Sequence, residues 1–345
     1  MREEHFVRRC FDLARQGSGQ VSPNPMVGAV LVHEGRIIGE GFHREYGTAH
    51  AEVNAINSVE AEDQQYIAAS TLYVSLEPCC IQGNTPPCTD LIISSKIPKV
   101  VISALDQTEA VRGKGVQQLR EAGIQVSTGL LEAEGEYLAA ARNTFVREQR
   151  PYIILKYATS QNQLFAPLPA RQLWLSNNYS KRLVHRWRME TDAILVGTNT
   201  AITDDPSLTN RLYFGRSPIR VVLDRELALP KSARLFDQRS KTIIFTRKEA
   251  EDQSIPSVQY IQIDFREELT QQIVSKLAQQ NITSLLIEGG AMTLESFIEA
   301  NLWDEARVFK TAKWIDKGIP APKLDLPPKA TFAIGNDKLE LYENR

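Results

Sequence analysis

Three short segments of the sequence bring together residue types that bind metals and move protons. They are His50-Ala51-Glu52, Glu77-Pro78-Cys79 and Pro86-Pro87-Cys88. One imidazole and two thiolates leave a fourth tetrahedral position open on a zinc ion, which is the arrangement of a catalytic site rather than a structural one. A carboxylate two residues from the histidine can move protons without ligating the metal. We therefore predict zinc held by His50, Cys79 and Cys88, with Glu52 as the proton shuttle.

This pattern is typical of zinc-dependent deaminases of nucleobase-like rings. The spacing departs from the usual one, because eight residues separate Cys79 from Cys88 where many deaminases place two. Each residue has an ordinary alternative, since a histidine in a helical run or a lone cysteine can simply belong to a core or a surface. Cys80 could compete as a ligand, although neighbouring residues rarely both reach one ion. The combination of the three segments favours the metal site.

Length and charge limit the remaining possibilities. A chain of 345 residues predicts two domains, each able to bury a core. The net charge of −2 and the lack of a basic block argue against tight nucleic-acid binding and favour a small-molecule substrate. The N-terminus is charged and no segment approaches membrane-spanning length, so we expect a soluble cytoplasmic protein. Three of the four cysteines crowd one loop and Cys10 stands apart, which suits metal binding better than disulfides.

The elements of the first half alternate between strands and helices. Apolar periodicity predicts strands at residues 29–33, 36–41, 71–76, 100–104 and 124–127, and helices at 3–16, from about 50, 89–95, 113–122 and 132–150. Such alternation indicates a sheet covered on both faces. The metal ligands would then lie at the N-termini of two helices, where the partial positive charge favours thiolates.

Asn24 is held between two prolines in the turn that precedes the first strand. Its amide offers a donor and an acceptor to a planar heterocycle. The alternative is that Asn24 only stabilises the turn.

The second half also alternates. We expect strands at residues 152–158, 193–196, 219–223, 242–246, 259–263 and 284–287, and helices at 180–190, 267–279 and 292–300. Glu288-Gly289-Gly290-Ala291 follows a strand directly, so backbone amides could approach a phosphate at the next helix N-terminus. An ordinary tight turn is the alternative, and the segment does not fit Gly-x-Gly-x-x-Gly.

Residues 1–147 resemble the deaminase half of the bifunctional riboflavin-biosynthesis family, which joins a pyrimidine deaminase to a reductase. The matching residues are Pro23-Asn24-Pro25-Met26-Val27-Gly28-Ala29-Val30, Gly41-Phe42-His43, Gly47, His50-Ala51-Glu52, Leu76-Glu77-Pro78-Cys79, Gly83, Thr85-Pro86-Pro87-Cys88 and Val111-Arg112-Gly113-Lys114-Gly115. The resemblance implies a cytidine-deaminase-like α/β/α domain. It also implies zinc on His50, Cys79 and Cys88, proton shuttling by Glu52, and a pyrimidine pocket lined by Asn24 and His43.

The loop between the two cysteines departs from this family. The family usually reads Ser-His-x-Gly-Lys/Arg-Thr-Pro-Pro there, whereas this chain has Ile81 in place of the histidine and Asn84 in place of the base. If those groups meet the ribose phosphate, two charge-assisted contacts are lost, each about 1.5–3 kcal/mol. Weaker substrate binding is the expected result.

Residues 148–345 resemble the reductase half of the same family, whose fold is similar to dihydrofolate reductase. The matching residues are Pro151-Tyr152, Leu155-Lys156, Ser160, Trp174, Arg188, Asp192-Ala193-Ile194-Leu195-Val196-Gly197, Thr200, Asp204-Asp205-Pro206, Leu208-Thr209, Arg211, Pro218-Ile219-Arg220-Val221-Val222-Leu223-Asp224 and Glu288-Gly289-Gly290. The resemblance implies NADPH contacts from Ala158, Trp174, Thr200, Asp204, Gly290, Ala291, Met292 and Thr293. It implies substrate contacts from Lys156, Gln172, Arg188, Leu208, Arg211 and Glu288.

Two arginines suit a phosphate because a planar guanidinium can bind it bidentately. For Arg188 the alternative is a solvated helix face, and for Trp174 it is a core position. A departure follows the first strand, where the family carries Ser-x-Asp-Gly and this chain reads Ser160-Gln161-Asn162-Gln163. Losing the glycine removes a residue that accepts positive φ easily, although Asn162 tolerates that region better than most residues. A shifted or weakened nicotinamide site is therefore a hypothesis.

Together these observations predict a cytoplasmic α/β enzyme of two domains that uses zinc and NADPH. The first would deaminate 2,5-diamino-6-ribosylamino-4(3H)-pyrimidinone 5′-phosphate, and the second would reduce its ribosyl group to a ribityl chain. The family implies a homodimer. The alternatives are a deaminase with a degenerate reductase-like scaffold, a nucleic-acid base deaminase, and a purely structural zinc protein.

Overall fold

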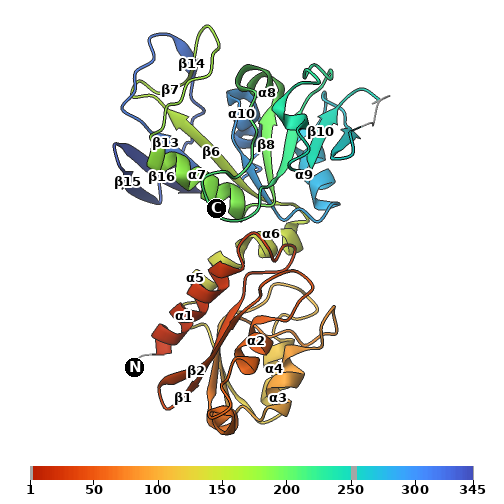
Figure 1. Ribbon diagram of the computed structural model, residues 1–345, viewed down its shortest axis with the longest axis vertical. Helices are drawn as coiled ribbons and strands as arrows, with labels where there is room; N and C mark the ends of the chain where they lie inside the picture. Colours follow the sequence, from red (N-terminus) through yellow and green to blue (C-terminus); the bar gives the residue numbers. More distant parts are fainter. Residues whose placement is uncertain (1–2, 250–254, 345) are drawn as a thin grey trace. The chain divides into compact units, whose positions relative to one another are not determined.

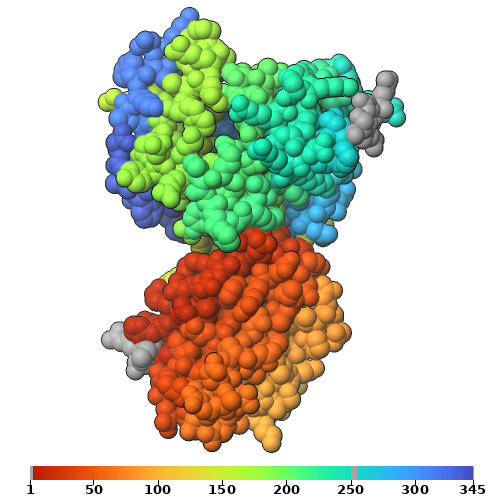
Figure 2. Space-filling view, in the orientation of Figure 1, coloured from red at the N-terminus to blue at the C-terminus, as the bar shows by residue number. Residues whose placement is uncertain are grey.

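The computed structural model describes residues 3–249 and 255–344, and it consists of two compact units (Figure 1). The units comprise residues 1–149 and 150–345. The division falls two residues after the boundary expected between residues 147 and 148. In the space-filling view of Figure 2, where colour follows residue number, the chain separates into the same two groups.

The first unit is built on a sheet of five strands in the order β2-β1-β3-β4-β5. Strand β1 pairs antiparallel with β2 and with β3, whereas β3, β4 and β5 run parallel. The strands are β1 (Gly28–His33), β2 (Arg36–Phe42), β3 (Thr71–Leu76), β4 (Lys99–Ala104) and β5 (Gln125–Thr128). The expected hairpin and the three later strands of this half are therefore confirmed.

Helices cover both faces of this sheet, as the alternating pattern predicted (Figure 1). Helix α1 packs on one face, and the apolar side chains of α2, α3 and α4 fill the core on the other. The helices are α1 (Glu3–Gln16), α2 (Ala51–Asn57), η1 (Gln64–Ala69), α3 (Cys88–Ser94), α4 (Lys114–Glu121), α5 (Glu132–Leu138) and α6 (Ala140–Glu148). The single helix expected at residues 132–150 is wrong. It breaks at Ala139, which is buried together with Leu138, so packing against the sheet rather than local propensity decides where the chain bends.

The second unit contains a sheet of nine strands in the order β11-β10-β9-β8-β12-β6-β13-β16-β15. The strands from β11 to β13 in this order are parallel, and β16 and β15 add to the edge in antiparallel fashion. The strands are β6 (Tyr152–Thr159), β8 (Ala193–Gly197), β9 (Ile219–Leu223), β10 (Thr242–Thr246), β11 (Val258–Gln262), β12 (Ser284–Ile287), β13 (Glu305–Lys310), β15 (Ala330–Ile334) and β16 (Asp337–Glu343). A separate ribbon joins β7 (Leu164–Pro167) to β14 (Gly318–Pro320). None of the strands after residue 300 was expected from the sequence.

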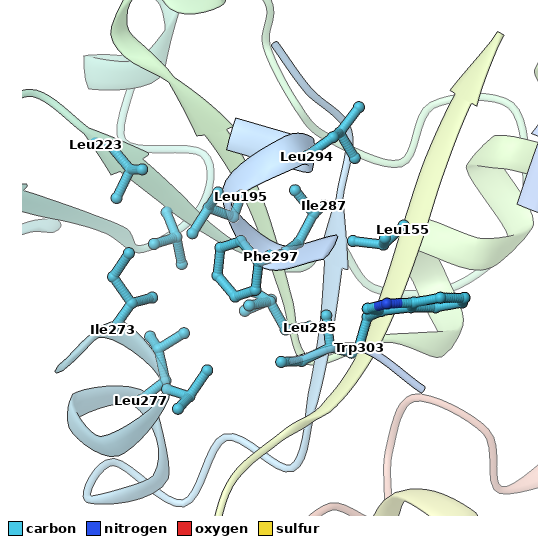
Figure 3. Close-up of a cluster of buried hydrophobic side chains, with 14 of the residues drawn as sticks. Leu155, Leu195, Leu223, Ile273, Leu277, Leu285, Ile287, Leu294, Phe297 and Trp303 are labelled. Atoms are coloured by element: carbon cyan, nitrogen blue, oxygen red, sulfur yellow. The ribbon is translucent and has the colours of Figure 1, made fainter. Parts of the chain in front are cut away.

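Alternate residues of the central strands point to opposite faces of this sheet. Leu155 belongs to the core beneath α9 and α10, which Figure 3 shows packed around Phe297, and Ile154 belongs to the core beneath α7 and α8. The helices are α7 (Asn178–Glu190), α8 (Thr198–Asp204), η2 (Arg234–Phe236), α9 (Leu269–Ala278) and α10 (Ala291–Glu299). Across the described ranges, no helix is long and apolar enough to cross a membrane.

The order of the strands places three carboxyl ends side by side. Strand β12 lies between β8 and β6 although it comes much later in the chain. In open α/β sheets, ligands bind beyond the carboxyl ends of the strands where the order reverses. Many of the expected ligand residues of the second unit follow β8 or β12, whereas Lys156 and Ala158 lie in the second half of β6 and Arg188 lies in α7.

Candidate functional site

The three expected metal ligands come together in the first unit. His50 is the N-cap of α2, Cys79 follows β3, and Cys88 is the first residue of α3. The Nδ1 atom of His50 lies 3.5 Å from the Sγ atom of Cys79 and 3.4 Å from that of Cys88. All ligand atoms lie within 4.8 Å of one another, and this is the single cluster of its kind among residues 3–249 and 255–344.

The donor set fits zinc, which accepts nitrogen and sulfur in a tetrahedral arrangement. Three protein ligands leave one position for a water or substrate. Cys80 is not a member of the cluster, since its thiol is directed toward the carbonyl oxygen of Ala110 at 3.9 Å. The competing role considered for Cys80 is therefore not supported by the geometry.

The two cysteine ligands influence each other's protonation. The contact with Cys88 lowers the pKa of Cys79 to about 4, and the same contact raises the pKa of Cys88. His50 also helps to lower the pKa of Cys79. Both cysteines would be thiolates when they hold a divalent cation, because metal ligation requires deprotonated thiols.

Glu52 lies in the first turn of α2, two residues after the histidine ligand. Its side chain is only 3 % exposed, and burial raises its pKa, with a further contribution from Cys79. A carboxyl group with a raised pKa holds a proton more readily than an ordinary one, which brings it closer to the balance that a general acid and base needs. The geometry thus gives Glu52 the properties that a proton shuttle needs.

Two glycines of β2 allow α2 to lie directly on the sheet. A Cβ atom at Gly39 would meet the carbonyl oxygen of Ala55 at 2.3 Å, and one at Gly41 would meet the backbone nitrogen of Ala55 at 2.3 Å. Real Cβ atoms do not approach so closely, so any side chain would push the helix away. The position of His50 and Glu52 therefore depends on these glycines.

Asn24 and His43 are joined by a hydrogen bond in the same region. The Nδ2 atom of Asn24 lies 3.1 Å from Nε2 of His43, and Nδ1 of His43 lies 3.1 Å from the carbonyl oxygen of Ala49. The carbonyl requires a proton on Nδ1, so Nε2 accepts from Asn24. Burial lowers the pKa of His43, which agrees with a neutral ring. The amide oxygen of Asn24 then remains available to a ligand.

These side chains border one cavity of about 350 Å³. That volume suits a single heterocycle with its attached sugar. Both residues that depart from the family loop, Ile81 and Asn84, are at its wall, and so is Arg142 of α6. Arg142 was not expected from the sequence, because no local pattern distinguishes it from the other charged residues of its helix.

Glu77 has a structural role that the motif did not reveal. Its buried carboxylate accepts hydrogen bonds from the backbone nitrogens of Asp106, Gly113 and Val116, at 3.3, 3.0 and 3.1 Å. A Cβ atom at Gly115 would meet the carbonyl oxygen of Pro78 at 2.3 Å. Glu77 therefore holds the segment before α4 against the loop that carries Cys79.

A second cavity, of about 110 Å³, lies in the second unit. It is bordered by every residue that the resemblance assigned to the substrate of this half and by two assigned to the cofactor, Trp174 and Asp204. The substrate residues are Lys156, Gln172, Arg188, Leu208, Arg211 and Glu288. The structure thus brings together residues from five separate stretches of sequence, while their roles remain proposals.

Glu288 forms the charged centre of this cavity. Arg188 donates two hydrogen bonds to its carboxylate at 2.8 and 2.9 Å, and Nζ of Lys156 lies 3.6 Å away. Burial alone would raise the pKa of Glu288, but Arg188 and Lys156 together lower it to about 2. The side chain of Arg188 is 12 % exposed, so the alternative of a solvated helix face is wrong.

Near the same cavity, His185 and Arg211 sit beside Thr209. Nδ1 of His185 accepts from the backbone nitrogen of Arg211 at 3.0 Å, and burial and neighbouring arginines lower the His185 pKa to about 4. Arg211 donates to Oγ1 of Thr209 at 3.0 Å. Because Arg188 is engaged by Glu288, Arg211 is the arginine of the two that has more freedom to meet a phosphate.

Most of the expected cofactor residues lie at the ends of β8 and β12. Gly290 is the N-cap of α10, and a Cβ atom there would meet Oγ1 of Thr200 at 3.0 Å. A Cβ atom at Gly197 would meet Oγ1 of Thr293 at 2.7 Å. Ala291 and Met292 continue α10, with Met292 largely exposed. This close approach of two helix N-termini leaves room for backbone amides to face a phosphate.

The remaining cofactor residues lie on neighbouring segments. Ala158 is on β6 opposite Phe309 of β13. Trp174 is not a core residue, since it is 53 % exposed and Nζ of Lys181 lies 3.9 Å above its ring. Gln172 donates to the carbonyl oxygen of Asp204 at 3.3 Å.

The positive φ of this turn lies at Gln163, the position at which the family carries glycine. Gln163 has φ of 62°, whereas Asn162 uses its amide to bind the chain on both sides. Its Oδ1 accepts from the hydroxyl of Ser160 at 2.8 Å, and its Nδ2 donates to the carbonyl oxygen of Ile315 at 2.7 Å. An aspartate could not donate the second bond, so the asparagine has a defined function in this turn.

Comparison with known proteins finds a matching family for each of the two units. Residues 1–104 match the family described as the cytidine and deoxycytidylate deaminase zinc-binding region, and residues 151–315 match the RibD C-terminal domain. The chain is 38 % identical to riboflavin biosynthesis protein RibD of Aquifex aeolicus, over 92 % of this chain and 89 % of that protein. It is 37 % identical to RibD of Bacillus amyloliquefaciens, over 93 % and 87 % of the two chains.

A solved structure from Thermotoga maritima is similar to the whole chain. It is described as a diaminohydroxyphosphoribosylaminopyrimidine deaminase/5-amino-6-(5-phosphoribosylamino)uracil reductase. The TM-score is 0.90 at 36 % identity, with 99 % of this chain and 98 % of that one covered. RibD of Acinetobacter baumannii gives a TM-score of 0.88 at 27 % identity, with 99 % of each chain covered.

Proposed function

The chain belongs to the RibD family of riboflavin-biosynthesis enzymes, and from this premise we propose how its residues carry two successive reactions. It is a bifunctional enzyme, with a zinc-dependent deaminase in the first unit and an NADPH-dependent reductase in the second. The observation that carries the deaminase assignment is the His50, Cys79 and Cys88 cluster beside the buried carboxyl of Glu52. The alternatives, a degenerate scaffold, a nucleic-acid base deaminase and a structural zinc protein, have no comparable support.

In the deaminase half, the substrate is the diaminopyrimidinone ribosylamino 5′-phosphate. Zinc, when bound, supplies a Lewis acid that activates a water for attack on the amine-bearing ring carbon. Glu52 accepts a proton from that water and delivers it to the departing ammonia, so a ring amine is exchanged for a carbonyl. Asn24, oriented by His43, holds the ring through its free amide oxygen.

In the reductase half, the ribosyl group of the deaminated product becomes a ribityl chain. NADPH supplies the hydride to the sugar carbon that is bonded to the ring amine. Ala158, Trp174, Thr200, Asp204 and the run from Gly290 to Thr293 would hold the cofactor. Lys156, Gln172, Arg188, Leu208, Arg211 and Glu288 would hold the substrate, and their common cavity supports this assignment.

Glu288 has a positioning role in this proposal. Because its carboxylate stays ionised and pairs with Arg188, it fixes the guanidinium and the ammonium of Lys156 at the wall of the cavity. Lys156 is within reach of the substrate there, and burial lowers its pKa. A lysine whose pKa is lowered can donate a proton to the sugar oxygen as the ring opens.

The location and assembly of the enzyme are also part of the proposal. Four free cysteines and no disulfide among the described residues suit a reducing cytoplasm. A homodimer is expected from the family resemblance, and light scattering of the purified protein would measure the molar mass directly.

The experiment that tests both activities is mass spectrometry of the product formed by the zinc-loaded protein, with and without NADPH. Deamination replaces an NH with an oxygen, and reduction then adds two hydrogens. We expect the first change without NADPH and both changes with it. A product that stops after deamination would support the degenerate-scaffold alternative, and an unchanged substrate would contradict the deaminase assignment.

A further inference from the structure

Arg142 is a basic residue in the deaminase cavity for which neither the motif nor the proposed reaction has a use. It lies in the first turn of α6, half-buried, and it is the only lysine or arginine among the described residues that border the cavity. His50 and Cys79 of the metal-ligand cluster border the same cavity, and so does Glu52. A positive charge is therefore available in the same space as the reacting ring.

The guanidinium of Arg142 has no partner in the protein that would neutralise it. No hydrogen bond or ion pair links its side chain to any residue in the described ranges. Burial lowers the pKa of Arg142, and only the more distant charges of Asp106 and Tyr46 oppose this effect. Asp106 is itself engaged, since one of its oxygens accepts from the backbone nitrogen of Thr108 at 2.6 Å. A desolvated, unpaired guanidinium is unfavourable unless an anion fills its hydrogen-bonding positions.

The other ionisable groups at the cavity wall cannot attract a phosphate. Glu52, Glu77 and Asp106 are carboxyl groups, burial lowers the pKa of His43, and His50 and Cys79 belong to the metal-ligand cluster. The loop position where related chains carry a base holds Asn84, and its neighbour Ile81 is uncharged as well. Outside the metal-ligand cluster, Arg142 is therefore the side chain of the described cavity wall that offers a positive charge to a phosphate.

We propose that Arg142 binds the 5′-phosphate of the deaminase substrate and so takes over the task of the base that is missing at Asn84. This inference rests on the proposed function, because the phosphate belongs to the proposed substrate. The guanidinium offers two parallel N–H donors to a phosphate. Tyr46 borders the same cavity and is 48 % exposed, and Arg142 is half-buried, so the wall that contains them faces solvent, where the sugar phosphate would extend from a ring held beside the metal ligands.

The test compares the phosphorylated substrate with the same compound lacking the 5′-phosphate. Arg142→Ala should lower kcat/KM for the phosphorylated substrate by roughly 10²-fold through KM, and it should leave the unphosphorylated one unchanged. Zinc content and Tm should stay as in the parent protein. Arg147→Ala is the matched control, since Arg147 lies on the same helix with its side chain 58 % exposed.

A second substitution tests the exchange of roles directly. Adding Asn84→Lys to Arg142→Ala should recover at least tenfold of the lost kcat/KM, because both positions border one cavity. Equal losses for the two substrates would show a structural role for Arg142, and no loss would show that the phosphate lies elsewhere. Either result overturns the proposal.

Binding of ribose 5-phosphate by calorimetry separates this proposal from the proposed function. We expect a binding event in the first unit that Arg142→Ala removes and Arg147→Ala preserves, whereas binding at the second cavity, which Arg211 borders, should stay unchanged in both variants. If the parent protein fails to deaminate but this event remains, the proposed reaction is wrong and the phosphate site stands. If deamination proceeds and Arg142→Ala removes no binding, the phosphate site is wrong and the reaction stands.

Discussion

At the scale of single residues, the absence of a base at position 84 affects the role that we propose for Arg142. Asn84 and Ile81 replace groups that could contact a phosphate, and weaker substrate binding stays a prediction on that ground alone. Arg142 reaches the same cavity from a helix almost sixty residues later. If Arg142 binds the phosphate, it offsets the expected loss of substrate affinity. Comparing the kinetics of Arg142→Ala with those of the parent measures the size of this offset.

Glu52 offers the most direct test of the deaminase chemistry. Glu52→Gln should abolish deamination, with kcat lowered by about 10²–10⁴-fold, because an amide cannot take up and release the proton. Zinc content should stay at one per chain, since the three ligands are untouched. Glu45→Gln, an exposed neighbour on the same unit, should behave as the parent protein. A Glu52→Gln protein that turns over normally would remove Glu52 from its role.

Glu288 should make the stability of the second unit depend on acid pH. Its pKa is about 2 in the folded protein and about 4.5 ordinarily, so the unfolded chain binds the proton more readily. The resulting stabilisation is complete above pH 4.5 and is lost as the pH falls from 4.5 toward 2. The amount is of order 3 kcal/mol.

Urea unfolding of the parent and of Glu288→Gln between pH 6 and pH 2.5 measures this contribution. The parent should lose stability more steeply below pH 4.5 than the variant does. The variant should also be less stable at neutral pH, because Arg188 and Lys156 are left buried without their counter-charge. Glu299→Gln, at the exposed end of α10, is the control. Parallel curves for parent and Glu288→Gln would contradict the assignment.

Among the elements, the short helix α2 matters most for the zinc site. Only seven residues long, it cannot hold its place by its own hydrogen bonds, and its position comes from packing on β2. The two glycines of β2 make that packing possible, because each lies under the backbone of Ala55. The sequence motif Gly41-Phe42-His43 thus serves the metal site from a distance.

Gly41→Ala should displace α2 and weaken zinc binding. A Cβ atom would meet backbone atoms at 2.3 and 2.5 Å, so the helix must move and we expect a loss of at least about 2 kcal/mol in stability. Zinc affinity measured by competition with a chelator should fall in parallel. Gly83→Ala serves as the control for unfolding, because nothing lies within 4 Å of its Cβ position. Unchanged stability and affinity would show that the sheet can adjust.

The turn between β6 and β7 also shows how the surrounding structure overrides propensity. Gln163 adopts a φ of 62° that a glycine would accept at less cost. The amide of Asn162 and the hydroxyl of Ser160 close the turn and tie it to Ile315. The turn therefore keeps a defined conformation. The weakened nicotinamide site stays a hypothesis, and ordinary NADPH-dependent turnover of the isolated 150–345 fragment would contradict it.

For the molecule as a whole, the two units have separate cores. The apolar clusters of residues 3–149 contain no residue of the second unit, and those of residues 150–344 contain none of the first. Each unit should therefore unfold on its own and respond to its own ligand.

Calorimetry of the intact chain tests this independence. A zinc chelator should lower the temperature of one unfolding transition and leave that of the other unchanged. The reason is that a metal bound only in the folded state stabilises only the unit that holds it. Excess NADPH should raise the temperature of the other transition alone, because at a hundredfold excess over its Kd it stabilises the second unit by about 2.7 kcal/mol. A single transition that shifts with both ligands would show that the units are energetically coupled.

The sequence by itself determined the parts that depend on spacing along the chain. His50, Cys79 and Cys88 are recognisable because each ligand adjoins a helix start or a strand end, and the fold brings the ligand atoms of all three within 4.8 Å of one another. The apolar residues of α1 and most strands of both sheets also follow from periodicity, which needs only neighbouring residues. The Glu288-Gly289-Gly290 turn was visible for the same reason.

The tertiary structure decided everything that depends on residues far apart in the chain. It closed the bidentate pair of Arg188 with Glu288, one hundred residues apart, and it placed Arg142 beside a cavity formed by residues 24–111. It put the positive φ at Gln163 rather than Asn162 and split the helix at Ala139. It also added β13, which pairs with the distant β6 and with β16, and the β15–β16 hairpin at the sheet edge. Such contacts arise from packing and charge pairing in space, and no local pattern of residue types encodes which distant partners will meet.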